Sequence, residues 1–316
     1  MVEEVVSFMA PHTGRVYCDA TVGAGGHALA ILEASAPEGV LIGIDRDEKA
    51  LESAAGRLSG YGSRLRLVHG RFSMLCEILS SMNIDRVDGI VLDLGISSMQ
   101  VDRAERGFSF QREGPVDMRM DTSQSTTAAD LIDDLSEREL ASIIYRYGEE
   151  RRSRKVARAL KDSGRNGELN STLDLAGTVH RALGKRSGAR IDSATRTFQA
   201  LRMAVNDEIG ELEKVMEMLP GPLSDNGSIV VISFHSLEDR IVKNRFNELS
   251  RECRCPAAQL ECSCDGALME KLTKKVVRPT ESEIDKNPRA RSARLRAARR
   301  VRPRFKPGKG NSANES

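Results

Sequence analysis

Short apolar runs alternate with helix-like segments near the start of the chain. Nearly continuous apolar runs are typical of strands that are buried in a parallel sheet. Such runs occupy residues 16–20, 40–44, 65–69 and 87–92. Between them, apolar residues recur at helical spacing in residues 27–35, 48–58 and 73–82. This order predicts a parallel sheet whose strands are joined by right-handed helical crossovers.

Beyond residue 94 the pattern becomes helical. From about residue 126 to 219 apolar positions follow helical spacing, and two helix starts carry capping pairs, Ser136 with Glu139 and Ser171 with Asp174. A strand pattern returns at 228–234, with a helix after it. We therefore predict an α/β domain formed by residues 1–112 and 200–300 and interrupted by an all-helical insertion, residues 113–199. Residues 301–316 have the composition of a disordered basic tail.

Charge is unevenly distributed along the 316 residues. Residues 271–316 contain 15 Lys and Arg against 4 Asp and Glu, a net charge of +11, whereas residues 1–270 carry −9, which together give the overall +2. A basic segment of this density favours contact with a phosphate backbone. Arginines are interleaved with apolar residues in "NPRARSARLRAARRV", residues 287–301, so we expect a docked helix there rather than a loose tail.

No apolar run approaches the length that a membrane span requires. The N-terminal segment "MVEEVVSFMAPHTG" carries acidic residues where a secretory signal needs basic ones. We therefore expect a soluble cytoplasmic protein with no membrane partner. The sequence leaves the oligomeric state open, a homodimer included.

A glycine-rich turn, "DATVGAGGHA", follows the first predicted strand. Glycines at such a turn let backbone amides approach a ligand closely, and Gly23, Gly25 and Ala28 satisfy the loose dinucleotide-binding pattern. Asp45 ends the second strand, where a carboxylate accepts hydrogen bonds from ribose hydroxyls. Both NAD and S-adenosylmethionine (SAM) contain an adenosine, so these residues alone do not separate hydride transfer from methyl transfer.

Two further strand ends favour methyl transfer. Phe72 follows the third strand in "HGRFS", where its ring packs either on an adenine or in the core. Asp93 ends the fourth strand in "LDLGISSMQ", at the edge where open α/β sheets bind ligands. A carboxylate there suits the cationic amino-acid part of SAM or an amino group to be methylated. An NAD-dependent oxidoreductase has less use for such an anion beside a nicotinamide ring.

The chain resembles the bacterial MraW/RsmH-type methyltransferases from about residue 7 to residue 300. The resemblance is carried, in chain order, by "DATVGAGGHA", "IDRD", "HGRFS", "VLDLGISSMQ", "ERGFSF", "GPVDMRMD", "ATRTFQALRMAVNDE", "SFHSLEDRIVK" and "NPRARSARLR". It implies a class I, Rossmann-like SAM-dependent methyltransferase with a mainly parallel sheet and a helical insertion. It also implies methylation of N4 of a cytidine in the decoding centre (the P-site region) of 16S rRNA in the small ribosomal subunit.

The resemblance further implies which residues contact SAM. These are Gly25, Gly26, His27, Asp45, Phe72, Asp93 and Gln100. The glycine turn and His27 would face the methionine end, Asp45 the ribose and Phe72 the adenine. No residue at these positions departs from the pattern of the family.

Candidate catalytic residues are those that could accept hydrogen bonds from the attacking amine. The first group is the loop after the fourth strand, with Asp93, Ser97 and Ser98. The second is "SFHSLEDR", where His235 could relay the released proton because its side chain titrates near neutral pH. The alternative is that His235 caps the helix that follows and that Glu238 favours its first turn.

Two other features allow a functional and a plain interpretation. The basic helix "EERRSRKVARALK", residues 149–161, either contacts RNA phosphates or is a solvated face. Cys253, Cys255, Cys262 and Cys264 either form a structural zinc site or remain free thiols, and C-x-C is tighter than the usual zinc spacing. Two alternatives to the cytidine activity also remain: methylation of another exocyclic amine of a nucleic acid, and a non-catalytic role in ribosome assembly.

Overall fold

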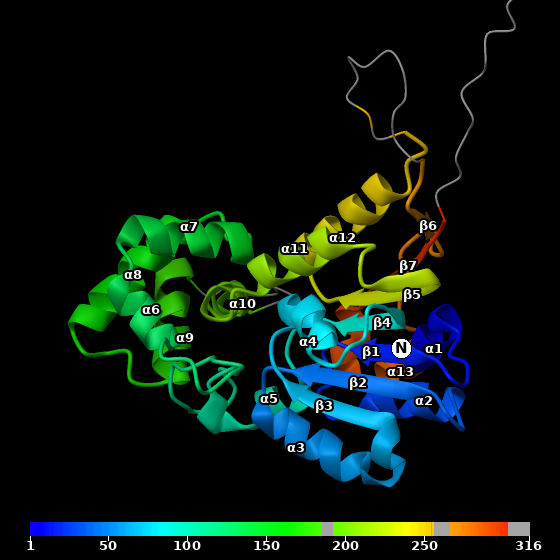
Figure 1. The fold of residues 1–316 in the computed structure, drawn as a ribbon. Coiled ribbons are helices and arrows are strands. Elements are labelled where there is room, and N and C mark those ends of the chain that lie inside the picture. Colours follow the sequence, from blue (N-terminus) through cyan, green and yellow to red (C-terminus); the bar gives the residue numbers. More distant parts are fainter. Residues whose placement is uncertain (185–191, 254, 256–265, 303–316) are drawn as a thin grey trace, which may run out of the picture. The chain divides into compact units, whose positions relative to one another are not determined.

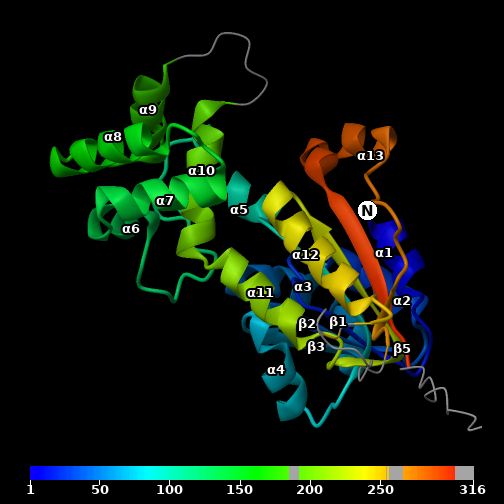
Figure 2. The same ribbon diagram turned by 90° about the horizontal axis from the view of Figure 1, so that it is seen from above.

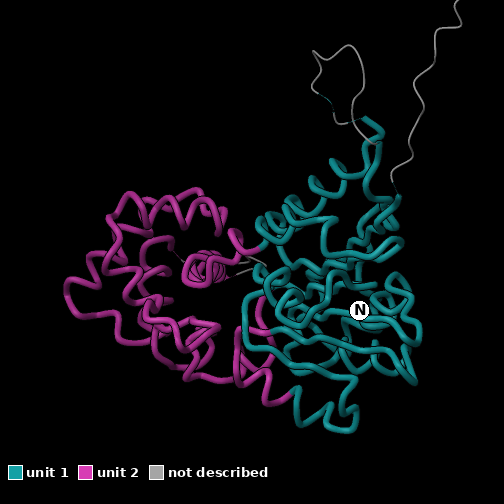
Figure 3. Tube along the Cα trace, viewed as in Figure 1, with its two compact units in different colours: residues 1–44, 54–94, 212–316 teal, residues 45–53, 95–211 magenta. Residues whose placement is uncertain are grey.

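The computed structural model describes residues 1–184, 192–253, 255 and 266–302 (Figure 1). The chain divides into two compact units, coloured separately in Figure 3. Unit 1 contains residues 1–44, 54–94 and 212–316, and unit 2 contains residues 45–53 and 95–211. Unit 2 is therefore wider than the predicted insertion, residues 113–199, and it includes a short segment that follows the second strand.

A seven-stranded sheet with the order β3-β2-β1-β4-β5-β7-β6 forms the centre of unit 1 (Figure 1). Its strands are β1 (Val16–Asp19), β2 (Val40–Asp45), β3 (Leu65–His69), β4 (Val87–Asp93), β5 (Leu223–Ser233), β6 (Met269–Lys271) and β7 (Arg294–Arg300). Strands β2, β1, β4 and β5 pair in parallel. The predicted strand–helix succession and mainly parallel sheet are confirmed. The sheet forms in this way because the apolar runs allow both faces of the central strands to be buried.

Helices cover both faces of this sheet. The helices wholly in unit 1 are α1 (Val2–Met9), α2 (Gly26–Ala34), α4 (Leu75–Ser81), α12 (Ser236–Leu249) and α13 (Glu281–Lys286), whereas α3 (Glu48–Arg57) and α11 (Glu208–Met218) begin in unit 2 and end in unit 1. Buried side chains of α4, α12 and the end of α11 share one core with Cys18 and Ile42. Tyr17 and Leu41 alternate with those two residues and face the opposite side, where α1 packs on α2 and β4.

The arginine-rich segment near the C-terminus is a strand, so the expected docked helix was wrong. Residues 288–292 form a single 3-10 turn, and β7 then pairs antiparallel with both β5 and β6. Leu295, Ala297 and Ala298 are buried. Backbone pairing along both edges of β7 outweighs the helix preference of Arg, Leu and Ala, because local propensities are small and tertiary contacts override them.

Unit 2 is helical and has a core of its own. Its helices are α5 (Ser98–Asp102), α6 (Ala128–Asp134), α7 (Glu137–Gly148), α8 (Ser153–Arg165), α9 (Thr172–Leu183) and α10 (Ser193–Val205). Ser136 caps α7 in a reciprocal box with Glu139, and Ser171 accepts from the backbone of Asp174, so both predicted helix starts are confirmed. Buried apolar residues of α6 to α10 form one continuous cluster.

Within the described residues, no helix combines the length and the apolar character that crossing a membrane requires. The predicted disordered tail lies almost wholly outside the described residues. Its first two residues are anchored in unit 1: Val301 donates its backbone N–H to the carbonyl oxygen of Leu268, and Arg302 pairs with Asp225.

Candidate functional site

The carboxyl edge of the sheet in unit 1 gathers the predicted donor-site residues that follow β1 and β4. Asp93 is the last residue of β4, and its backbone N–H donates to Thr21 Oγ1 over 2.6 Å. Asp93 is paired with Ile232 of β5, one residue before that strand ends. Since ligands of open α/β sheets bind outside the carboxyl ends of the strands, this edge is the candidate site.

The glycine turn after β1 is shaped by backbone geometry. Gly25 caps α2 with φ of 78°, a left-handed conformation that a residue with a side chain adopts only at a cost. A Cβ atom on Gly25 would also lie 3.0 Å from Leu58 Cδ1. A Cβ on the next residue, Gly26, would meet nothing within 4 Å. Gly25 therefore forms the turn, whereas Gly26 keeps one side of it open.

His27 and Asp93 face each other next to this turn. His27 Nδ1 lies 3.7 Å from Asp93 Oδ2. The other polar atom of each side chain, Asp93 Oδ1 and His27 Nε2, is buried and has no hydrogen-bond partner in the described part of the chain. Buried polar atoms are nearly always paired, so this pair needs an explanation. A cationic ligand group that donates to Asp93 supplies one, and the ammonium of SAM has that chemistry; the residues fit the donor.

Burial controls the charges of this pair. Desolvation raises the pKa of Asp93 above its ordinary value, and the nearby Glu238 carboxylate adds to the rise, while His27 opposes it. Desolvation likewise lowers the pKa of His27, against the attraction of Asp93. Neither charge is well stabilised without a ligand. A bound cation would favour the ionised form of Asp93, so the site is electrostatically prepared for one.

The other two predicted adenosine contacts lie at the ends of neighbouring strands. Asp45 is the last residue of β2, and its Oδ1 accepts the backbone N–H of Asp47 over 2.9 Å. Phe72 begins a short 3-10 turn after β3 and is partly buried against the core of unit 1. Both stay predictions as SAM contacts. In the protein alone, Asp45 orders the turn after β2 and Phe72 packs in the core.

Ser97, Ser98 and Gln100 belong to unit 2. Ser97 caps α5 in a reciprocal box with Gln100, and Ser98 is the exposed first residue of that helix. Gln100 is 5% exposed, and its side-chain amide is engaged at both ends: Oε1 accepts from the Ser97 backbone, and Nε2 donates to Asp47 Oδ2. Gln100 therefore fixes the loop, and its contact with SAM stays a prediction.

Asp47 is the centre of a buried network that the sequence did not reveal. Besides Gln100 Nε2, it accepts from Arg106 Nη1 over 2.9 Å, and both Asp47 and Arg106 are about 95% buried. Arg106 also donates to the carbonyl oxygens of Arg119 and Met120. The network ties the segment after β2 to α5 and to the loop after it, within unit 2. Asp47 belongs to the motif "IDRD", residues 44–47, in which the sequence predicted a role only for Asp45.

His235 caps α12, as the structural alternative predicted. Its Nδ1 accepts the backbone N–H of Glu238 over 3.3 Å, and its Nε2 lies 3.1 Å from Glu238 Oε1. Glu238 is 2% exposed, and its Oε2 accepts the backbone N–H of Phe234 over 2.8 Å. With Nδ1 used as an acceptor and Nε2 next to a carboxylate, His235 has a fixed orientation at the carboxyl edge. Its role as a proton relay stays a prediction.

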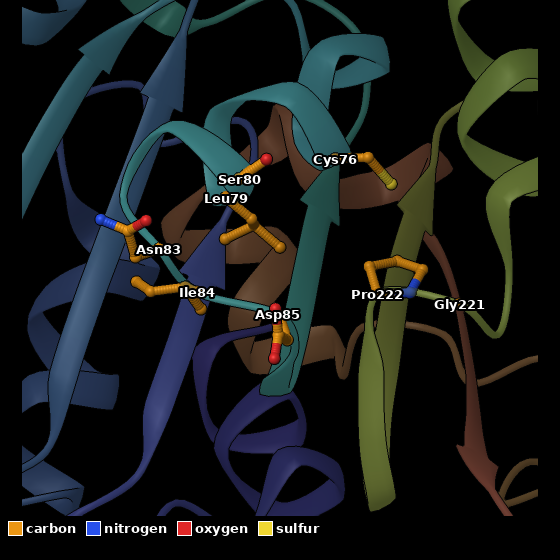
Figure 4. Close-up of a pocket in the computed structure, with 8 residues that line it drawn as sticks. All are labelled: Cys76, Leu79, Ser80, Asn83, Ile84, Asp85, Gly221 and Pro222. Carbon is orange, nitrogen blue, oxygen red and sulfur yellow. The ribbon is translucent and has the colours of Figure 1, made fainter.

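A separate cavity of about 410 Å³ lies at the opposite edge of the sheet (Figure 4). It is lined by Cys76, Leu79, Ser80, Asn83, Ile84, Asp85, Gly221 and Pro222. These residues precede the amino-terminal ends of β4 and β5, and none of them was predicted to bind a ligand. The cavity therefore does not belong to the candidate site.

The proposed zinc site cannot be assembled from the described residues. Cys253 and Cys255 are described, whereas Cys262 and Cys264 lie outside the described residues. In the ranges that the structure describes, no group of three or more His, Cys, Asp or Glu has an arrangement that could hold a metal ion. Zinc stays a sequence prediction.

The two glycines of the turn give a matched test of donor binding. We expect Gly26→Ala to fold normally, because its methyl group enters open space and alanine favours a helix start over glycine by about 0.5–1 kcal/mol. The same methyl group should weaken SAM binding roughly tenfold or more by blocking close approach to the turn. Thermal unfolding and calorimetric titration with SAM measure both effects.

Gly25→Ala is the control for that test, since it should lower the melting temperature through backbone strain and contact with Leu58. Wild-type affinity for SAM in the Gly26→Ala protein would show that the donor does not approach this turn.

The chain is similar to known proteins along nearly its whole length. The family described as the MraW methylase family matches residues 1–301. "Ribosomal RNA small subunit methyltransferase H" of Syntrophobacter fumaroxidans is 50% identical over 299 residues, which is 94% of either chain. The protein of the same name from Geotalea uraniireducens is 48% identical over 303 residues, covering 95% of this chain and 97% of that one. A solved rRNA methylase of Streptococcus thermophilus is 9% identical with a TM-score of 0.39, covering 95% of this chain and 94% of that one.

Proposed function

The chain belongs to the MraW methylase family of SAM-dependent methyltransferases, and on this premise we propose that it methylates 16S rRNA of the small ribosomal subunit. The names of the two relatives described above, which share about half of its residues, support this substrate. The finer proposal is methylation of N4 of a cytidine in the decoding centre, as the nine sequence motifs imply. Such a protein acts in the cytoplasm, where ribosomes are assembled.

The observation that carries the proposal is the half-buried Asp93 carboxylate beside the glycine turn. Its Oδ1 is buried and lacks a hydrogen-bond partner among the described residues, and it lies where the strand edge opens. Desolvation makes such an anion costly, and the described residues give its Oδ1 no compensating hydrogen bond. A site that binds a cationic donor and orients an amine makes use of it.

The chemistry follows from the weakness of the nucleophile. The lone pair of a cytosine N4 amine is delocalised into the ring, so the amine must be held in line and given hydrogen-bond acceptors. SAM, when bound, supplies a methyl group on a positively charged sulfur. Asp93 would hold the ammonium of the donor. The Ser97 and Ser98 hydroxyls are the acceptors that the sequence predicts for the amine. Strong base catalysis is unnecessary, since the amine becomes acidic once methylated.

Methylation of ribosomal particles tests the proposed function. Small subunits purified from a strain that lacks this gene should accept a labelled methyl group from SAM in the presence of the protein. Mass mapping should place the label on one cytidine in the decoding centre. Label at another exocyclic amine would reject the cytidine assignment, and no label, with normal SAM binding, would favour a non-catalytic role in assembly.

Helix α8 is the proposed phosphate-binding face of unit 2. One side of the helix is buried through Val156, Ala157 and Leu160, while the opposite side is basic. Exposed on that side are Arg154, Lys155, Arg158 and Arg165, and Arg151 and Arg152 are exposed just before the helix begins. Arg158 lies 3.4 Å from Glu137, and Arg165 lies 3.5 Å from Asp162. Carboxylates thus offset part of this charge, but Arg154 and Lys155 have no such partner in the described part of the chain.

We expect Arg154→Gln combined with Lys155→Gln to weaken binding of the rRNA and to make it less sensitive to salt. Each lost phosphate contact lowers the slope of log affinity against log salt by about 0.7–0.9. Filter binding at several salt concentrations measures the slope. Arg165→Gln is the control, because Asp162 already offsets that charge. An unchanged slope in the double variant would mean that this side of α8 is only a solvated surface.

A further inference from the structure

Strand β7 brings arginines to the carboxyl edge of the sheet. Its first residue, Arg294, pairs with Ser233, the last residue of β5, and the following residue, Leu295, pairs with Ile232. Ile232 in turn pairs with Asp93 on β4. Neighbouring strands are about 4.8 Å apart, so β7 runs roughly 10 Å from Asp93 along this edge. Asp93 and Arg294 therefore share one edge of the sheet, although about 200 residues separate them in the sequence.

The four arginines of β7 are not equivalent. Arg296 forms a two-point contact with Asp239 of α12, with distances of 2.7 and 3.2 Å. Arg300 lies 3.6 Å from Asp225. For Arg294, by contrast, the described residues provide no carboxylate, and its Nε is buried without a hydrogen-bond acceptor. Guanidinium groups are rarely left unsatisfied in this way, so an anion from outside the protein is the simplest partner.

The direction of this side chain is fixed by the strand. Side chains alternate along a strand, so Arg294 and Arg296 project from the same face of β7. Asp239, the partner of Arg296, lies in the first turn of α12, and that helix runs along this face (Figure 2). Arg294 is one pleat closer to the carboxyl edge and therefore lies next to the start of α12. The partial positive charge of a helix N-terminus adds to that of Arg294.

The position of β7 in the sheet distinguishes acceptor from donor. In the strand order β1-β4-β5-β7, the glycine turn follows β1, on one side of Asp93. Arg294 is on the other side, two strands away. A donor bound over the glycine turn leaves the β5–β7 side for the nucleotide to be methylated. The base and the phosphate of a nucleotide lie at opposite ends of the ribose. The separation of roughly 10 Å between Asp93 and β7 suits a base held near Asp93 and a phosphate held by Arg294.

We propose that Arg294 binds a backbone phosphate of the RNA at or next to the nucleotide whose base enters the site. The assignment rests on the proposed function, since it identifies the side of the same edge that holds the acceptor. Arg294 is a binding residue for the substrate and takes no part in the transfer of the methyl group.

The test compares Arg294→Met with Arg299→Met in methylation of small subunits from a strain lacking the gene. Methionine keeps the length and packing of the arginine stem while removing the charge. Arg299 is the matched control, because it is on the same strand, about 16 Å toward the opposite end, and pairs with Ser228. We expect Arg294→Met to raise the KM for the subunit roughly tenfold or more and to lower the salt slope by about 0.7–0.9, with SAM affinity unchanged.

Arg294→Lys is the second variant, and it covers the case in which the methionine variant does not fold. Lysine retains the point charge but not the planar fork, so the salt slope should remain while KM rises less. A wild-type KM and slope in both variants would overturn the proposal. So would a loss of SAM affinity in place of RNA affinity, since Arg294 would then bind the donor carboxylate. If the wild-type protein does not methylate the subunit at all, the proposed function itself fails.

Discussion

Asp93→Asn is expected to reduce methyl transfer by roughly 100-fold or more, because the charge-assisted hydrogen bond to the donor ammonium is lost. Asparagine has nearly the same shape, so the loss reports the charge. Calorimetry should show weaker SAM binding, and single-turnover methylation of small subunits should show a slower chemical step. Asp85→Asn is the control: Asp85 is an exposed carboxylate just before the amino-terminal end of the same strand.

The same substitution should raise the free energy of unfolding of the protein without ligand at neutral pH. Burial raises the pKa of Asp93, so the folded state binds its proton more tightly than the unfolded state does. This group therefore contributes stability that is fully present at low pH and is lost as the pH rises through the raised pKa. Asparagine does not ionise, so the variant avoids this loss of stability as the pH rises. Chemical denaturation at several pH values measures it.

The pH dependence of wild-type activity should follow the same group with the opposite consequence. Binding of a cation needs the ionised carboxylate, so methylation should decline as the pH falls through the raised pKa of Asp93. Near-normal turnover in the Asp93→Asn protein would show that Asp93 does not belong to the site. If the substitution instead destabilises the fold, the Asp93 carboxylate has a structural partner.

Asp47→Ala is expected to lower the stability of unit 2 by about 3–5 kcal/mol, because it leaves the buried Arg106 guanidinium without its carboxylate. The side chains of Asp47 and Arg106 are each 5% exposed, so water cannot replace the lost partner. The substitution also removes the acceptor of Gln100 Nε2. Denaturant unfolding monitored by circular dichroism should show an early transition of the helical unit.

Glu137→Gln provides the comparison for Asp47→Ala. It removes an exposed ion pair with Arg158, in which the two side chains are 42% and 71% exposed. Such pairs contribute less than about 1 kcal/mol. Equal effects of the two substitutions would mean that the Asp47 network is not the main electrostatic support of unit 2.

The residues of the candidate site could be predicted where their position follows from the local sequence alone. The glycine turn, Asp45 and Asp93 each end or follow a predicted strand, and the carboxyl ends of parallel strands necessarily meet at one edge. Asp47, Arg106 and Arg294 were not predictable in this way. The environment of each depends on a partner distant in sequence, and charged residues in a loop or an arginine-rich segment are usually solvated.

The sequence alone determined the strand–helix order, the mainly parallel sheet, the helical character of the middle of the chain and the sheet edge that carries the candidate site, because periodicity and turn chemistry are local properties. Only the tertiary structure decided that the arginine-rich segment is a strand, that Arg106 pairs with Asp47, and that Gln100 is held by the same carboxylate. The physical reason is the same in each case. Strand pairing, burial and ion pairing depend on which distant residues become neighbours, and that is settled only when the chain packs.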